Sequence, residues 1–257
     1  MANPPSGGIT GQIMKASISV LVTAAVLAIG ASAHATQFVV NGDFTQLSHG
    51  VGKIDSGTTV TGWDNPAAGG QTHAYNFVMA SATTGAGGVA LWDAANGGDN
   101  TWNGKAAGAG NFAAMDGAYQ TGPIEQTLTG LTVGASYVLS FNYAFAQQKG
   151  YNGATVQHLT ETLGGQTFTS ADTDLPSHGF SGWQSFTTTI VAKSATETLS
   201  FLAYGNKPVP PFALVSNVSL TGGVPEPATW AMMILGIGGI GAALRSRRAR
   251  TLALQAA

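Results

Sequence analysis

The residues whose types and spacing best suit chemistry lie in a polar segment from Trp92 to Lys105, Trp-Asp-Ala-Ala-Asn-Gly-Gly-Asp-Asn-Thr-Trp-Asn-Gly-Lys. Sugars bind to flat aromatic rings beside amide and carboxylate groups, because a pyranose ring has apolar faces and a polar rim. We therefore expect Trp102 to be an exposed ligand platform, with Asp99 and Asn103 as its hydrogen-bonding neighbours. Long polar loops of this kind carry function on rigid scaffolds.

No catalytic constellation is evident in the sequence. The Gly-x-Ser-x-Gly and His-Glu-x-x-His patterns are absent. Asp172 and Asp174 stand two residues apart in a polar stretch and could form a glycosidase pair or ligate calcium, but solvated carboxylates are the simpler interpretation. His49, His73 and His178 are scattered, so they are interpreted as loop residues rather than metal ligands. We expect the chain not to be an enzyme.

The region between residues 36 and 222 is dominated by alternation of apolar and polar residues, the pattern of strands. The strand-like segments are residues 60–63, 75–79, 89–92, 124–128, 137–143, 155–163, 166–169, 183–191, 198–204 and 212–220. Short strands at roughly ten-residue spacing predict an all-β sandwich or jelly roll. Trp63, Trp92 and Trp183 lie in these patterns and are expected in the core.

The N-terminus is typical of an export signal. Lys15 precedes an apolar run and then Ala33-His34-Ala35, a small-x-small cleavage pattern. We expect residues 1–35 to be a signal peptide for the Sec export machinery, cut after the second of these alanines or after the first. Met14 is an alternative start.

The expected mature body is acidic. From Thr36 to Val224 the chain has five lysines, no arginine and 11 acidic residues, a net charge of −6. Nucleic-acid binding needs a basic face, so we exclude a nucleic-acid partner. The chain has no cysteine and therefore neither a disulfide nor a thiol nucleophile. The body from Thr36 to Val224, about 190 residues long, fits one domain.

The C-terminus combines three features in a fixed order. They are Pro225-Glu226-Pro227 with Trp230-Ala231, an uncharged run of 17 residues at 228–244, and a basic cluster of Arg245, Arg247, Arg248 and Arg250. Such a run is at the short end of what spans a bilayer, and the arginines after it should stay cytoplasmic. We expect a transmembrane helix at 228–244, a cytoplasmic tail at 251–257 and the body across the membrane.

This order of features resembles the PEP-CTERM sorting domain, in its PEPxxWA variant, over residues 223–250. The resemblance implies recognition by an exosortase, a membrane protease that would cut near the Pro-Glu-Pro motif. The body would then be released to the cell surface or to an exopolysaccharide matrix, and the chain would be the substrate of that reaction.

The body resembles the galactose-binding-like jelly roll of bacterial carbohydrate-binding modules. The matching residues are Asn41-Gly42-Asp43-Phe44, Thr61-Gly62-Trp63, Ile124-x-Gln126-x-Leu128, Tyr137-x-Leu139-x-Phe141-x-Tyr143, Gly182-Trp183-x-x-Phe186 and Leu214–Leu220. The resemblance implies a jelly-roll sandwich of residues 36–222, glycan binding and a structural calcium held by two carboxylates. Thr45 and Ser216 stand where those carboxylates would be, which leaves Asp43 as a substitute ligand.

Together these features favour an exported, non-catalytic surface or matrix protein that binds glycan. The alternative is a structural or adhesive biofilm-matrix component without a specific ligand. An extracellular glycosidase is the third hypothesis, and it lacks an evident acid and base pair.

Overall fold

The computed structural model describes residues 36–67, 71–206, 208–222, 233–242 and 245. The expected signal peptide at 1–35 and tail at 251–257 lie outside this part. So do the sorting residues Pro225, Glu226, Pro227, Trp230 and Ala231, and Arg247, Arg248 and Arg250 of the basic cluster.

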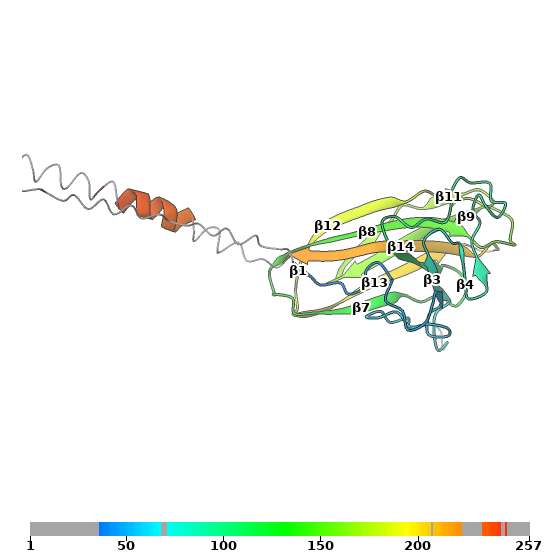
Figure 1. Ribbon diagram of the computed structural model, residues 1–257, viewed down its shortest axis with the longest axis horizontal. Coiled ribbons are helices and arrows are strands. Elements are labelled where there is room, and N and C mark those ends of the chain that lie inside the picture. The colour runs from blue at the N-terminus through cyan, green and yellow to red at the C-terminus, as the bar shows by residue number, and fades with distance from the viewer. Residues whose placement is uncertain (1–35, 68–70, 207, 223–232, 243–244, 246–257) are drawn as a thin grey trace, which may run out of the picture. The chain divides into compact units, whose positions relative to one another are not determined.

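The body folds into two antiparallel sheets (Figure 1), as the alternation predicted. The seven-stranded sheet has the order β12-β8-β14-β6-β3-β2, with β1 beside β14. Its strands are β1 (Thr36–Gln37), β2 (Gly52–Lys53), β3 (Asn76–Ala80), β6 (Asn111–Asp116), β8 (Ser136–Gln147), β12 (Gln184–Val191) and β14 (Pro211–Gly222).

The five-stranded sheet has the order β10-β9-β13-β7, with β11 also paired to β9. Its strands are β7 (Ile124–Thr129), β9 (Thr155–Leu163), β10 (Gln166–Thr169), β11 (Thr173–Leu175) and β13 (Thr196–Gly205). A small hairpin of β4 (Gly85–Ala86) and β5 (Val89–Ala90) completes the strands of the described part.

The main core lies between the inner faces of the two sheets. β8 contributes Leu139 and Phe141, and β13 contributes Leu199 and Phe201, all nearly inaccessible to solvent. Each such side chain contributes about 1.5–3 kcal/mol by its burial. Trp63 is buried in the same core, where its Nε1 donates to the carbonyl of Asn41 at 3.1 Å. The prediction of a core Trp63 is therefore confirmed.

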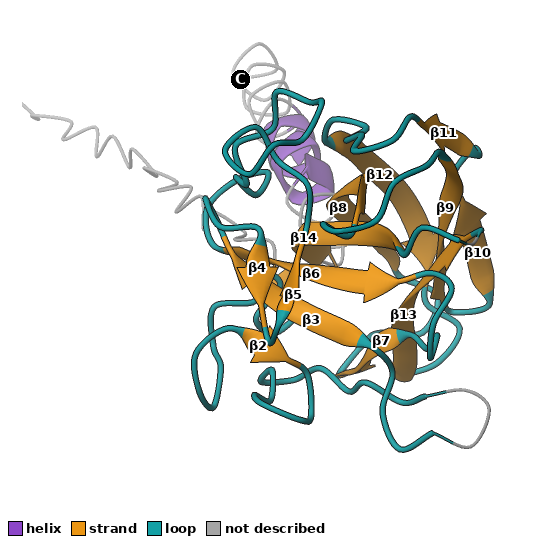
Figure 2. Ribbon diagram, turned by 90° about the vertical axis from the view of Figure 1, so that its right-hand side faces the viewer, coloured by secondary structure: helices purple, strands orange, loops and turns teal. Residues whose placement is uncertain are grey.

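The centre of the seven-stranded sheet is buried on both faces. Along β14, Ala213 and Val215 face the main core, whereas Phe212 and Leu214 belong to a second cluster. The second cluster also contains Leu91 and Trp102, as well as Ala86 and Val89 of the β4–β5 hairpin. The hairpin and the segment that follows it therefore cover this outer face (Figure 2).

Residues 233–242 are helical, and their large apolar side chains are exposed. The expected span at 228–244 reaches beyond them into residues outside the described part. Within the residues described, no helix has both the length and the hydropathy needed to cross a membrane. Arg245 is exposed.

Candidate functional site

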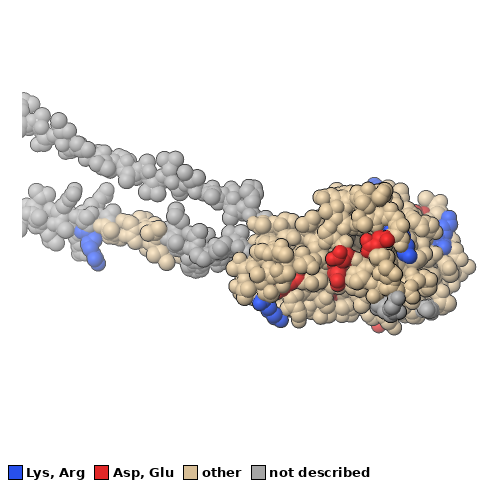
Figure 3. Space-filling model, turned by 90° about the horizontal axis from the view of Figure 1, so that it is seen from below, with Lys and Arg blue, Asp and Glu red and all other residues tan. Residues whose placement is uncertain are grey.

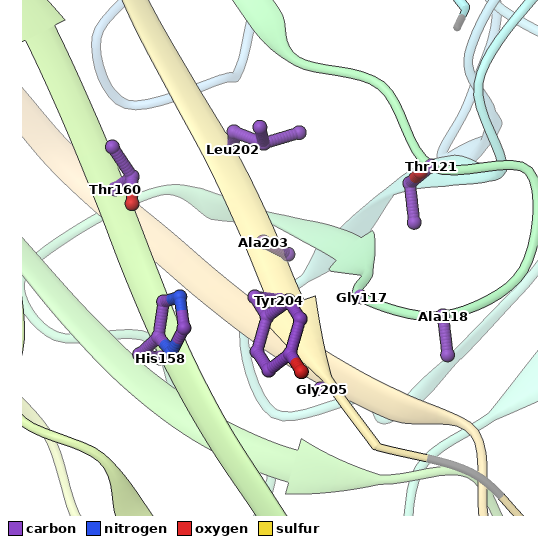
Figure 4. A pocket seen from close by; sticks show the side chains of 9 residues that line it. All are labelled: Gly117, Ala118, Thr121, His158, Thr160, Leu202, Ala203, Tyr204 and Gly205. Carbon is purple, nitrogen blue, oxygen red and sulfur yellow. The ribbon is translucent and has the colours of Figure 1, made fainter. Parts of the chain in front are cut away.

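A hollow of about 420 Å³ lies on the outer face of the five-stranded sheet (Figure 4). Strand alternation builds it: along β9 and β13 every second side chain enters the core, so His158, Thr160 and Tyr204 face outward. The segment from Gly117 to Thr121 forms the opposite wall. We call this the sheet-face hollow.

Tyr204 is the exposed aromatic ring of the sheet-face hollow, at 53% exposure. It lies directly across the strand pair from His158, and the two rings stack at 4.4 Å with an interplanar angle of 14°. Nδ1 of His158 lies 2.8 Å from Oδ1 of Asp172. Since His158 covers one face of the tyrosine and Asp172 holds the imidazole, the opposite face of Tyr204 is the one open to a ligand.

The opposite wall is fixed by short contacts with the strands. Gly117 donates to the carbonyl of Pro211 at 2.8 Å and accepts from the N–H of Gly205 at 3.0 Å. A Cβ at Gly117 would lie 2.6 Å from the backbone of Tyr204, so this close approach requires glycine. Asp116 accepts from the backbone N–H groups of Ala118 and Tyr119 at 2.8 Å each and so holds the turn.

A second hollow, of about 650 Å³, lies between the segment at 99–103 and the segment at 176–182. It brings together the three predicted ligand-binding residues Trp102, Asp99 and Asn103. Asn100 joins its walls, because its Nδ2 donates to the carbonyl of His178 at 2.6 Å. We call this the loop hollow.

Trp102 itself is buried, with 6% of its surface exposed, so the expectation of an exposed platform is wrong. Its ring stacks on Phe180 at 4.3 Å and 8°, and its Nε1 donates to the carbonyl of Lys105 at 2.9 Å. The physical reason is the second cluster: the outer face of β6 and β14 needs an apolar cover, and Trp102 supplies part of it. Ligand binding by these residues stays a prediction.

Trp92 and Trp183 are half-buried rather than in the core. The Trp92 ring lies 4.1 Å from the His178 ring, tilted by 34°, and its Nε1 donates to the carbonyl of Tyr151 at 3.0 Å. Trp183 packs against the second cluster from its edge. Both residues lie just outside a strand, Trp92 after β5 and Trp183 before β12, so the alternation of the strand does not predict whether their side chains are buried.

The carboxylates and histidines singled out in the sequence have local partners. Asp172 holds His158, whereas Asp174 lies exposed on β11. His73 lies 3.4 Å from Asp55. Within the described residues, no group of three or more His, Cys, Asp or Glu side chains could hold a metal ion.

The structure brings Asp43 and Ser216 to the same loop at 107–111, where the resemblance implied calcium. Both carboxylate oxygens of Asp43 accept from the Thr45 hydroxyl at 3.0 Å. Ser216 donates its hydroxyl to the carbonyl of Ala107 at 3.1 Å. Calcium prefers six to eight oxygen ligands, including carboxylates, so this donor set fits the ion poorly.

Sequence reasoning missed Tyr204 and His158. Their signal was present in the alternation, which places Tyr204 on the face opposite Phe201. It also missed Glu161. This residue alternates in phase with Leu159 and Leu163 along β9, so its side chain points into the sandwich as theirs do.

Three solved carbohydrate-binding modules are similar to the body at low identity. TmCBM61 in complex with β-1,4-galactotriose is 10% identical with a TM-score of 0.35, and the match covers 72% of this chain and 97% of that chain. A CBM4 module is 15% identical with a TM-score of 0.34, covering 72% and 99%. The CBM22-1 xylan-binding domain of Paenibacillus barcinonensis Xyn10C is 12% identical with a TM-score of 0.31, covering 69% and 95%. At these values none of the three informs on the ligand of this chain.

No curated protein matches the sequence. The family model of the PEP-CTERM protein-sorting motif does match, at residues 223–248. The chain therefore carries a PEP-CTERM sorting motif C-terminal to its β-sandwich.

Proposed function

We propose that this is an exported surface or matrix protein whose sandwich binds a glycan without cleaving it. The PEP-CTERM motif supports export, and it supports an exosortase as the partner that processes the tail. On this proposal the sorting helix holds the protein at the inner membrane until processing places the body at the cell surface or in the matrix.

The observation that carries glycan binding is the Tyr204 platform. A flat ring with one free face suits the apolar face of a sugar, and the hydroxyls of Thr121 and Thr160 lie in the same hollow to meet the polar rim. The volume of about 420 Å³ is within the usual range of ligand sites. The acidic body favours a neutral glycan over a polyanion, because like charges repel.

The distribution of the lysines also favours a neutral glycan over a polyanion. On the face of the sandwich shown in Figure 3, the few lysines lie among acidic and uncharged residues and form no extended basic patch. A polyanionic polysaccharide would need such a patch, as a nucleic acid would.

The loop hollow is the second place where glycan could bind. It is larger and carries the exposed carboxylate of Asp99, but its tryptophan offers almost no free face. Binding there would rest on hydrogen bonds from Asp99 and Asn103 rather than on ring stacking.

The test is binding of the purified full-length protein to an array of neutral and acidic polysaccharides. Tyr204→Ala should weaken binding about two- to twelvefold, since an aromatic contact is worth about 0.5–1.5 kcal/mol. Tyr151→Ala is the matched control, because Tyr151 is an exposed tyrosine outside the lining of either hollow. A joint Asp99→Ala and Asn103→Ala variant addresses the loop hollow.

The outcomes separate the hypotheses. Loss of binding in Tyr204→Ala alone assigns the sheet-face hollow, and loss in the joint variant alone assigns the loop hollow. A blank array together with a biofilm defect on deletion favours the structural or adhesive alternative. Hydrolysis of any polysaccharide overturns the non-catalytic proposal.

A further inference from the structure

A small cavity opens at the side of the sandwich where the edge strands of the two sheets face each other. β10 ends the five-stranded sheet and β12 ends the seven-stranded sheet. The rings of Phe168 and Phe186, one on each edge strand, stack at 3.8 Å and 27°. Beside them lies a cavity of about 170 Å³, with Leu163 and Ile190 as further apolar walls and with Gln166, Thr167 and Thr188 as polar ones.

Glu161 also lines this cavity, although only 3% of the residue is exposed. Glu161 and Leu163 are two residues apart on β9 and lie on the same, inner face of the strand. The carboxyl group of Glu161 therefore points between the sheets. Its Oε1 atom is buried and has no hydrogen-bond partner. Leaving such an atom unpaired costs about 1–3 kcal/mol, and the cost is larger for a charged group.

Within the described part of the chain, no cation forms an ion pair with Glu161. The strands β10 and β12 carry no ionisable side chain. Lys193 and Glu197 lie against the turn at Gly164 and Gly165 that follows β9, and Glu197 accepts from the backbone N–H of Lys193 at 2.7 Å. Desolvation by burial raises the pKa of Glu161 to about 7.

The residues that line this cavity and its volume exclude several classes of ligand. An anion would be repelled by the Glu161 carboxylate, and a purely apolar ligand would leave Oε1 unpaired. A sugar is too large, because a cavity of about 150 Å³ holds one benzene molecule and a pyranose has about twice as many heavy atoms. A small cation carrying alkyl groups suits Glu161 and the aromatic and aliphatic walls together, because ammonium groups pair with carboxylates and are attracted to aromatic faces.

We propose that this cavity binds a compact organic cation, a primary or methylated ammonium, through Glu161 and the Phe168–Phe186 pair. An engineered cavity of about 150 Å³ holds one benzene molecule, so a ligand of four to six heavy atoms fits the volume here. The site lies apart from both glycan hollows and does not depend on them.

The test uses the full-length protein and tert-butylammonium chloride as the probe, with tert-butanol as the neutral molecule of the same shape. Thermal unfolding is followed at about pH 8, where a carboxyl with a pKa of about 7 is ionised. The ammonium should raise the melting temperature in a saturable manner, because it binds only the folded state. The alcohol at equal concentration should not. The apparent affinity should fall about tenfold at about pH 6, where most Glu161 is protonated.

Variants make the test specific. Glu161→Gln keeps the shape and should lose the stabilisation by the ammonium, whereas Asp174→Asn removes an exposed carboxylate on β11 and should keep it. Phe186→Leu should weaken binding without abolishing it. Equal stabilisation of Glu161→Gln and the natural protein, equal effects of alcohol and ammonium, or no effect of the ammonium on the natural protein would each overturn the proposal. Glycan binding should be unchanged in Glu161→Gln, so the two proposals can fail separately.

Discussion

Trp102 and Trp183 donate their indole N–H groups to one shared acceptor, the backbone carbonyl oxygen of Lys105, each at 2.9 Å. Trp102 belongs to the loop that covers the outer face of the large sheet, and Trp183 immediately precedes β12. The shared carbonyl therefore ties the covering loop to the sheet edge. The same contact satisfies the indole N–H of Trp102 in its buried position.

Trp102→Ala should lower the free energy of unfolding by about 3–5 kcal/mol, because it leaves a cavity beside Phe180 and Phe112. Trp183→Phe keeps most of the ring and should cost about 0.5–1.5 kcal/mol for the lost hydrogen bond. Urea unfolding of the two variants measures the difference. Equal, small costs would contradict the structural role of Trp102. Because of this role, glycan binding lost in Trp102→Ala would not identify a ligand contact.

The strand pattern of the body could be predicted because alternation is local. The expected segments at 155–163 and 166–169 have the bounds of β9 and β10. The pairing order could not be predicted, since it depends on contacts between distant segments. Thr36, for example, pairs with Gly222 at the other end of the domain.

The candidate site was predicted less well than the fold. The glycine-rich, polar composition around Trp102 is typical of an exposed loop, but the loop folds over β6 and β14. Phe112 and Phe212 on those strands create the need for a cover, and no local pattern shows which segment provides it. Tyr204 is a different case: alternation places it on the outer face of β13, but its stacking on His158 and the wall at 117–121 depend on contacts between distant segments.

The Tyr204 platform predicts a graded series of glycan affinities. Tyr204→Phe should bind nearly as well as the natural protein, because the ring face is kept and only the hydroxyl is lost. Asp172→Ala should weaken binding about two- to threefold, since it frees His158, the residue that backs the ring. Titration calorimetry with the best polysaccharide of the array measures the series. A Tyr204→Phe variant as weak as Tyr204→Ala would assign binding to the hydroxyl instead of the ring.

The sorting motif predicts where the protein accumulates in its own host. Changing Pro225, Glu226 and Pro227 together to alanine should leave the full-length chain in the inner membrane, because the exosortase would no longer recognise it. Fractionation and intact mass measure the outcome. Gln255→Ala, in the expected cytoplasmic tail, should be processed normally. Release of the triple variant at the natural rate would refute the role of the motif.

Glu161 predicts that the body loses stability as the pH rises. Its pKa is raised by burial from 4.5 to about 7 in the folded protein, whereas the unfolded chain should titrate near the ordinary value. Between these values the folded state holds the proton more tightly, so the free energy of unfolding falls from about pH 4.5 to about pH 7 and then levels off. The total loss is about 3 kcal/mol by the conversion of a pKa shift to free energy.

Glu161→Gln isolates this contribution, because glutamine has the same shape and does not titrate. The variant and the natural protein should have similar stability at about pH 4.5, and the variant should be more stable by about 3 kcal/mol at about pH 8. Urea unfolding at the two pH values measures the difference between the two proteins. That comparison cancels the titration of other groups, including Asp55, whose pKa burial also raises. Parallel pH profiles for the two proteins would show that Glu161 is ionised at little cost in the folded state, which would mean that water or an ion reaches its carboxyl.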